Sequence, residues 1–467
     1  MRSALLLALG AGLAGGAACS FTTASGFTEC STDVDCGPGF ACVKRFCLPL
    51  PDGCRRHAGV FNTTNRVPLV SVQPLTLSAD DGGTTTDESE LQGLNAMTLA
   101  VEEANKFDGL KGRAFGLFFC DTFDDNSRGA AQAGWMVKNV GTPAILTSGS
   151  GLTTNVANEP DRKAAQAFIM SPTATSASLL ALFRDDGNVW RVAPDDSQQA
   201  AVLAGEVAQA TAGNVNLKVV VAYEDSVYGS AFEPALRDEL SRRGRLPVGI
   251  PFTRGLDRSA TTTLLNRVEN ESPVATILIA FRPDVVSIVS DGATRPKLQR
   301  ANGHRWFLSD AAKDPGIVTP QTAVELEAAL GTAPAQGAGA AFGSFSDAFF
   351  TRFGVRPDTY SFTSHSYDAA WLTMGAAAWA TQQGGGITGA RMREGMGRVS
   401  QTSLPPLRLL ASNWTELSTS LSSGTSVNVE GSSGALDYNL DAGTPSSPYE
   451  VWQVLDGGIS TVRLVTP

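Results

Sequence analysis

The sequence contains few of the residues that carry out chemistry on a substrate. Its 467 residues include only 3 histidines, and His57, His304 and His365 are scattered along the chain, which argues against a metal site. The segment Gly149-Ser150-Gly151 lacks the G-x-S-x-G spacing of a hydrolase nucleophile turn. Without a nucleophile beside a base, we expect a protein that is not an enzyme and that uses no metal and no cofactor.

Clusters of basic residues and long hydrophobic runs are also missing. The net charge is −10 at pH 7, and without a basic patch to neutralise phosphates we expect no nucleic-acid partner. Hydrophobic residues make up 42% and charged residues 18% of the chain, a globular composition that argues against multiple membrane spans. At this length the chain is expected to build two well-filled cores.

The N-terminal segment resembles an export signal. Arg2 precedes an apolar stretch over Leu5–Leu13 that is too short to span a membrane, and small residues then lead to Cys19. We expect residues 1–18 to be a lipoprotein signal peptide and Cys19 to be lipidated, with ordinary cleavage and release as the alternative. Ser20 favours the outer membrane. The predicted location is therefore the periplasm or cell envelope, with a lipid anchor as the attachment to the membrane.

The remaining cysteines predict disulfide bonds, because an even number in an exported chain favours oxidation over free thiols. They are Cys30, Cys36, Cys42, Cys47, Cys54 and Cys120. Zinc is the competing interpretation, but no C-x-x-C pair supports it. The first five lie in a Cys-rich module over residues 19–60. We expect one bridge, Cys54 with Cys120, to tie this module to the following lobe, and the sequence leaves the other pairings open.

From Arg66 onward, segments with strand and helix patterns alternate. The predicted strands are Pro68–Leu75, Ala114–Cys120, Ala144–Leu146, Phe168–Met170, Val219–Tyr223, Pro247–Phe252, Val274–Phe281 and Trp306–Leu308. The predicted helices include one around Leu94–Ala104, one over Gln198–Gln209 and one over Ser230–Arg242. This order predicts an α/β fold with mostly parallel sheets and right-handed crossovers.

Two of the predicted strands end in turns rich in hydroxyl groups. Thr147-Ser148-Gly149-Ser150 follows one of them, and Ser171-Pro172-Thr173-Ala174-Thr175-Ser176 follows the next. Open α/β sheets bind ligands at the carboxyl ends of their strands. Small hydroxyls and backbone N–H groups at that place suit an anionic group but supply no nucleophile with its base, so they indicate binding rather than catalysis.

Several short segments follow one another in an order that is typical of one family. They are Leu91-Gln92-Gly93-Leu94-Asn95-Ala96, Thr147-Ser148-Gly149, Ser171–Ser176, Val219–Gly229, Phe281-Arg282-Pro283-Asp284, Trp306–Asp310 and Ser366–Ala370. In this order the chain resembles the type I periplasmic solute-binding proteins of the leucine/isoleucine/valine class, which serve ABC-type importers. The resemblance implies two lobes joined by three crossings, with lobe 1 at residues 66–183 and 341–430 and lobe 2 at 184–340 and 431–467.

The resemblance also implies a ligand site between the lobes. In members that bind amino acids, hydroxyl groups of lobe 1 bind the α-carboxylate, which here assigns Ser148, Thr175 and the backbone of Thr173. An acidic residue of lobe 2 binds the α-ammonium group, and this assigns Asp310. The aromatic walls of the implied site are Tyr228, Phe281 and Phe362.

Structural roles are the alternative for the same residues. Ser148 and Thr175 are also placed to cap the helices that follow them, and Asp310 to form a turn or a cap. Arg282 either adds a positive charge to the cleft, which favours an acidic ligand, or faces solvent. A loop predicted over Ser78–Glu90 lies near where the family's first-lobe loop touches the ligand, so the specificity of other members does not transfer.

From these features we expect an extracytoplasmic lipoprotein that captures a small polar ligand, an amino acid or a related compound. It would deliver this ligand to the membrane subunits of an ABC importer. The alternative is a ligand sensor, or an outer-membrane lipoprotein that regulates another protein such as a peptidoglycan synthase. The role of the Cys-rich module is not explained by transport.

Overall fold

The computed structural model describes residues 28–78, 83–212, 217–382, 386–440 and 443–466. The expected signal peptide and the expected lipidation site at Cys19 lie outside the described residues. Within the described part of the chain, no helix combines the length and the hydropathy needed to cross a membrane.

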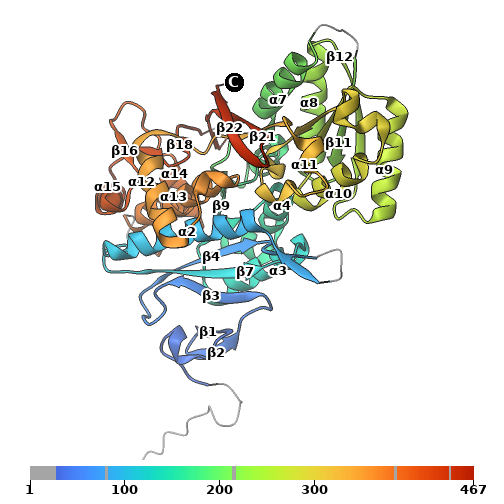
Figure 1. The fold of residues 1–467 in the computed structure, drawn as a ribbon. Coiled ribbons are helices and arrows are strands. Elements are labelled where there is room, and N and C mark those ends of the chain that lie inside the picture. Colours follow the sequence, from blue (N-terminus) through green and yellow to red (C-terminus); the bar gives the residue numbers. More distant parts are fainter. Residues whose placement is uncertain (1–27, 79–82, 213–216, 383–385, 441–442, 467) are drawn as a thin grey trace, which may run out of the picture.

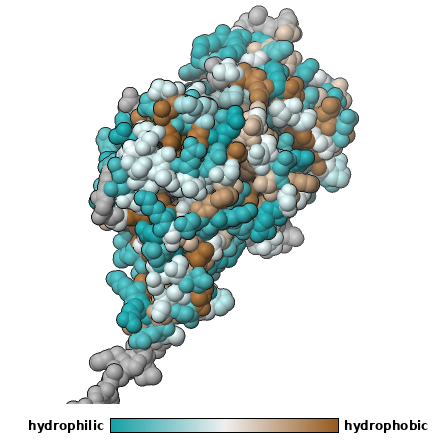
Figure 2. All heavy atoms as spheres, turned by 90° about the vertical axis from the view of Figure 1, so that its left-hand side faces the viewer, coloured by the Kyte–Doolittle hydropathy of each residue, from teal (hydrophilic) through white to brown (hydrophobic). Residues whose placement is uncertain are grey.

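A small disulfide-linked module begins the described chain and forms a narrow extension of the molecule (Figures 1 and 2). It consists of a hairpin of β1 (Phe40–Val43) and β2 (Phe46–Pro49), bridged by Cys30–Cys42 and Cys36–Cys47. The third disulfide is the expected one, Cys54–Cys120. These three bridges use the six cysteines that the sequence assigned to disulfides, so the predicted oxidised state is confirmed.

The first of two large sheets has six strands in the order β10-β9-β8-β4-β7-β3. These strands are β3 (Cys54–Gly59), β4 (Val67–Gln73), β7 (Phe115–Asp121), β8 (Ala144–Thr147), β9 (Phe168–Ser171) and β10 (Val189–Arg191). Only β3 runs antiparallel to its neighbour in this sheet of the described chain. β3 therefore belongs to the sheet, although the sequence grouped it with the Cys-rich module.

Helices cover both faces of the first sheet. Successive residues of a strand point to opposite sides, so the buried residues of each strand pack alternately against the helices of one face and of the other. Leu69 shares one core with α2 (Glu88–Lys106) and α13 (Thr363–Thr381), while Val70 shares the opposite core with α4 (Ser150–Asn158). The remaining helices around this sheet are α3 (Asn126–Trp135), α5 (Pro160–Ala165), α6 (Ala177–Phe183), α12 (Gly339–Phe353), α14 (Gly389–Met396) and α15 (Trp414–Ser422).

The second sheet has seven strands in the order β12-β11-β13-β14-β15-β21-β22. Its strands are β11 (Leu217–Glu224), β12 (Arg245–Phe252), β13 (Ala275–Ile279), β14 (Arg305–Leu308), β15 (Leu330–Pro334), β21 (Tyr449–Leu455) and β22 (Gly458–Val465). The first five are parallel, and β21 and β22 are antiparallel to their neighbours. The flanking helices are α7 (Asp196–Ala210), α8 (Gly229–Arg242), α9 (Arg258–Glu271), α10 (Arg282–Gly292) and α11 (Ala323–Leu326).

Short strands complete the structure. They are the hairpin β5 (Thr76–Ser78) and β6 (Thr84–Thr86), the group β16 (Pro406–Arg408), β17 (Asn428–Gly431) and β18 (Gly434–Ala435), and the pair β19 (Tyr438–Asn439) and β20 (Thr444–Pro445). The segment predicted as a loop over Ser78–Glu90 thus includes β6 and the first turn of α2. The α/β fold class is confirmed.

The chain passes between the two halves three times. We call residues 54–191 and 339–445 the first lobe, and residues 196–334 and 449–465 the second lobe, because each set builds one sheet with its helices. Both lobes are visible in Figure 1, where the red strands β21 and β22 lie between the orange helices of the first lobe and the green and yellow helices of the second. β10 pairs in the first sheet although the sequence placed residues from 184 onward in lobe 2. Tyr438 likewise packs in the core of the first lobe.

Candidate functional site

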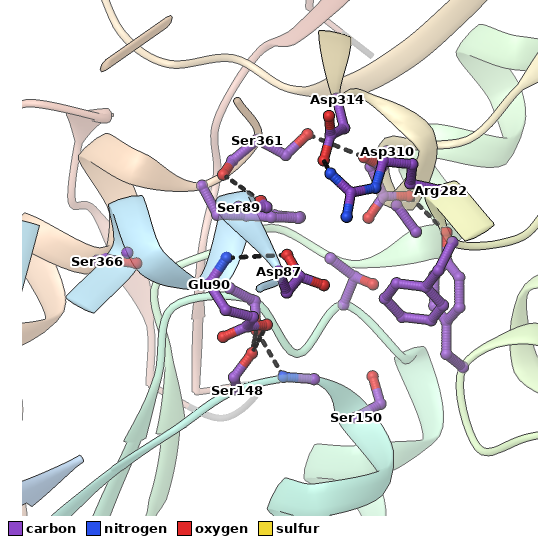
Figure 3. Close-up of a pocket in the computed structure, with 18 residues that line it drawn as sticks. Asp87, Ser89, Glu90, Ser148, Ser150, Arg282, Asp310, Asp314, Ser361 and Ser366 are labelled. Carbon is purple, nitrogen blue, oxygen red and sulfur yellow. Dashed lines mark hydrogen bonds and ion pairs between the residues drawn. The ribbon is translucent and has the colours of Figure 1, made fainter. Parts of the chain in front are cut away.

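A cavity of ≈ 70 Å³ lies between the two lobes, at the carboxyl ends of their strands. All seven residues that the sequence proposed for ligand binding line it. They are Ser148, Thr173, Thr175, Tyr228, Phe281, Asp310 and Phe362. The structure therefore brings together side chains that the sequence scatters over more than two hundred positions. Figure 3 shows the cavity with residues from both lobes pointing into it.

The first-lobe wall is made of the turns that follow β8 and β9. Ser148 donates its hydroxyl hydrogen bond to the Glu90 carboxylate and lies 3.2 Å from the Thr173 hydroxyl, which also accepts a hydrogen bond from the Gly149 N–H at 2.6 Å. The N-caps of the following helices are Gly149 for α4 and Ser176 for α6. The alternative in which Ser148 and Thr175 cap these helices is therefore wrong.

The second-lobe wall centres on Asp310, which follows β14. Its Oδ1 accepts hydrogen bonds from the Tyr228 hydroxyl at 2.6 Å and from the Gln199 amide at 3.0 Å. The rings of Tyr228 and Phe281 lie 6.1 Å apart, and the Arg254 guanidinium stacks on Phe281 at 4.0 Å. Asp310 begins the 3-10 turn Asp310–Ala312, whose N-cap is Ser309, so the turn expected as a structural role is present, and the same carboxylate also belongs to this buried network.

Burial raises the pKa of Asp310, although the hydrogen bonds from Tyr228 and Gln199 act in the opposite direction. Burial also raises the pKa of the neighbouring Asp196 well above its usual range, and the charge of Asp310 raises it further. Both carboxyl groups, together with burial, raise the pKa of Tyr228. The second-lobe end of the cavity therefore disfavours negative charge and would be stabilised by a cation.

Several lining residues were not among the proposed ligand-binding residues. They are Asp87, Ser89, Glu90, Gly93, Gly149, Ser150, Arg282, Ala311, Asp314, Ser361 and Ser366. The first three come from the start of α2, inside the segment predicted as a loop near the ligand. An N-cap signal, Asp87 followed three residues later by Glu90, marks that helix start in the sequence.

Arg282 does not add an unmatched positive charge to the cavity. Its Nη1 donates to Asp314 Oδ2 at 3.2 Å, and its Nη2 donates to the carbonyl of Thr86 in the first lobe at 3.3 Å. Its guanidinium is therefore neither a free anion receptor nor a solvent-facing group. The preference for an acidic ligand considered from the sequence loses its basis.

Contacts between the lobes enclose the cavity. Arg254 forms an ion pair with Asp124 of the first lobe at 3.3 Å. On the other side, Ser361 of the first lobe donates to the backbone carbonyl of Asp310 at 2.9 Å, and within the first lobe Ser89 donates to the carbonyl of Ser361 at 3.4 Å. The adjacent Phe362 has a φ of 64°, a left-handed conformation that is costly for an aromatic residue and that is found at functional sites.

Two α/β lobes that close on a small polar cavity define the class of two-lobed small-molecule binding proteins. The chain belongs to the periplasmic binding protein family, whose model matches residues 76–458. The resemblance to the type I leucine/isoleucine/valine class is thereby confirmed, and membership of this family implies an exported protein. The family consists of substrate-binding proteins rather than enzymes.

Individual relatives agree with this assignment. A curated relative, the chemotactic signal transduction system substrate-binding protein BasB of Halobacterium salinarum, is 26% identical over 378 residues, which cover 79% of this chain and 84% of the relative. The leucine binding protein LivK of Thermotoga maritima is 16% identical with a TM-score of 0.67, over 86% of this chain and 99% of that one. LivJ of Streptococcus pneumoniae, solved in complex with isoleucine, is 16% identical with a TM-score of 0.65, over 86% and 100% of the two chains.

Proposed function

We propose that the protein captures a small ligand with an ammonium group, an amino acid or a related compound, and delivers it to an ABC importer. The observation that supports this most is the convergence of Ser148, Thr175 and Asp310 on one cavity between the lobes. Hydroxyl groups and a buried carboxylate on opposite walls suit a ligand with separate polar ends. Closure of the lobes would remove such a ligand from water.

The proposed location of the protein rests on the sequence of the N-terminal residues, which lie outside the described part of the chain. We propose that Cys19 carries a lipid after removal of residues 1–18, so that the protein is attached to the cell envelope. The Cys-rich module then separates the lobes from the anchor. Loss of membrane association in a Cys19→Ala variant, measured by fractionation, is the expected outcome.

A second candidate function is delivery of the ligand signal to a chemotaxis receptor. It is favoured by one observation, the curated relative BasB, whose name assigns it to a chemotactic signal transduction system. Both functions use the same captured ligand and differ in the membrane partner that contacts the closed lobes. Co-purification of the ligand-bound protein with either importer subunits or a receptor separates them.

The test of ligand capture is a thermal-shift screen of the mature protein against the standard amino acids, small amines and aromatic carboxylates. A ligand at a hundred times its Kd stabilises the folded state by about 2.7 kcal/mol, which gives an easily measured rise in Tm. An Asp310→Asn variant should show a clearly smaller shift and so serves as the control. If no compound raises the Tm of the wild-type protein, ligand capture of this kind is wrong.

A further inference from the structure

The position of the Glu90 side chain is not explained by the helix that carries it. Glu90 is the third residue of α2, where a glutamate usually reaches back to the N–H of the N-cap residue. Here the N-cap is Asp87, and its N–H already donates to the carbonyl of Leu75 at 2.8 Å. Glu90 instead turns toward the cavity, where its carboxylate accepts the hydrogen bond of Ser148.

Glu90 therefore occupies the part of the first-lobe wall where the ligand's own carboxylate was expected. Figure 3 shows it directed at Ser148, across the cavity from Asp310. In its ionised form, Glu90 at this place repels a carboxylate of a ligand and attracts a cation. Because Glu90 comes from the first lobe and Asp310 from the second, the cavity has an acidic group on each of its two walls.

The other charged side chains that line the cavity have partners within the protein. Among the described lining residues there are four carboxyl groups and one guanidinium, namely Asp87, Glu90, Asp310, Asp314 and Arg282. Arg282 pairs with Asp314, and Asp87 accepts the N–H of Glu90 at 3.1 Å as the helix cap. Glu90 and Asp310 receive hydrogen bonds from neutral donors, Ser148 on one side and Tyr228 with Gln199 on the other. These two carboxyl groups are the ones left to a cationic ligand.

We propose that the cavity selects a small ligand with two cationic nitrogen groups, one directed at Glu90 and the other at Asp310. A diamine and a basic amino acid share this chemistry. Such a ligand would connect an acidic group of each lobe and so favour closure. The inference rests on the proposed function, since it names the class of ligand for the same site.

The proposal also predicts that ligand binding is linked to the release of a proton. Burial and the nearby Asp87 raise the pKa of Glu90 to about 8, while Ser148 and Arg254 act against this rise and Asp124 adds to it. A bound cation favours the ionised carboxylate, so binding below this pKa releases a proton. Affinity should therefore increase from pH 6 to pH 8, by up to about tenfold per pH unit while Glu90 starts protonated.

The experiment is isothermal titration calorimetry of the mature protein with four probes: L-lysine, 1,4-diaminobutane, L-leucine and L-glutamate. We expect L-lysine or 1,4-diaminobutane to bind at least tenfold more tightly than the two other probes. Whichever of these two binds more tightly shows whether the ligand is a basic amino acid or a diamine. Glu90→Gln, which keeps the shape of the side chain, should weaken this binding at least tenfold and abolish the proton release seen in buffers of different ionisation enthalpy. The matched control is Glu102→Gln, which makes the same charge change on α2 at a residue paired with Arg352, away from the cavity lining.

Other outcomes would overturn the proposal in distinguishable ways. If L-leucine or L-glutamate binds the wild-type protein best, and binds Glu90→Gln more tightly still, Glu90 merely covers the site of a ligand carboxylate. Ligand capture then stands and the dication inference is wrong. If none of the probes binds the wild-type protein and the broad thermal-shift screen is also negative, the proposed function fails together with the inference.

Discussion

The two walls of the cavity are built on different principles. The first-lobe wall presents the turns after β8 and β9, whose hydroxyl groups bond to each other, to backbone N–H groups and to Glu90. The second-lobe wall presents the turn after β14, where Asp310 is buried in a network with Tyr228 and Gln199. In the same turn, Lys313 is buried against Glu450 of β21 at 2.5 Å.

This difference determines how much stability or affinity is lost when a side chain of each wall is substituted. A neutral hydroxyl is inexpensive to bury, because most of its cost is recovered by one hydrogen bond. A buried charge remains stable only while its partner is present. We therefore expect substitutions of the buried charged groups on the second-lobe wall to have larger effects than substitutions of the hydroxyl groups on the first-lobe wall.

The largest effect is expected on stability, from Lys313→Met. The Lys313 ammonium and the Glu450 carboxylate are 1% and 3% exposed, and Lys313 also donates to the carbonyl of Asp358 at 3.1 Å. Removal of one member leaves a buried charge without its partner, so the free energy of unfolding should fall by about 3–5 kcal/mol in urea denaturation. The control is Lys218→Met, whose exposed pair with Glu271 should contribute less than about 1 kcal/mol. If the two variants lose the same free energy of unfolding, the buried pair is no more important for stability than the exposed one, and this expectation is wrong.

The second effect is expected on ligand affinity, from Asp310→Asn. Asparagine keeps an oxygen for Tyr228 and Gln199 but removes the charge that faces the ligand. A hydrogen bond to a charged group contributes about 1.5–3 kcal/mol, so the Kd should rise by about 10- to 100-fold. Calorimetry with the ligand from the screen measures this. Asp291→Asn, in a partly buried pair with Arg295 of the same lobe, should leave the Kd unchanged. An unchanged Kd in Asp310→Asn would show that this wall does not contact the ligand.

The core and the first-lobe wall were predictable because their signals are local. Uninterrupted apolar runs mark strands that are buried on both faces, and β8 and β9 are fully buried. The turns that follow them must meet at the same edge of a parallel sheet, which is why Ser148 and Thr173 lie together. The family resemblance then supplied Asp310 and the aromatic residues from the other lobe.

The parts that were missed depend on contacts between distant segments or on weaker signals. Nothing near Gln199 in the sequence indicates its hydrogen bond to Asp310, which is 111 positions away. The hairpin of β21 and β22 was missed although Asp456-Gly457, both with positive φ, is a typical turn signal. β22 is largely exposed, so it lacks the apolar run by which the other strands were found.

The smallest effects are expected on the first-lobe wall, from Thr175→Val and Ser148→Ala. Each removes one neutral hydroxyl, which contributes about 0.5–1.5 kcal/mol, so the Kd should rise by about two- to tenfold in calorimetry. The control Thr154→Val removes a hydroxyl that bonds to Ser150 within α4, and it should not change the Kd. If Thr175→Val instead weakens binding as much as Asp310→Asn, the hydroxyl wall anchors the ligand as strongly as the charged one. The two walls would then differ in how they are built but not in how they bind.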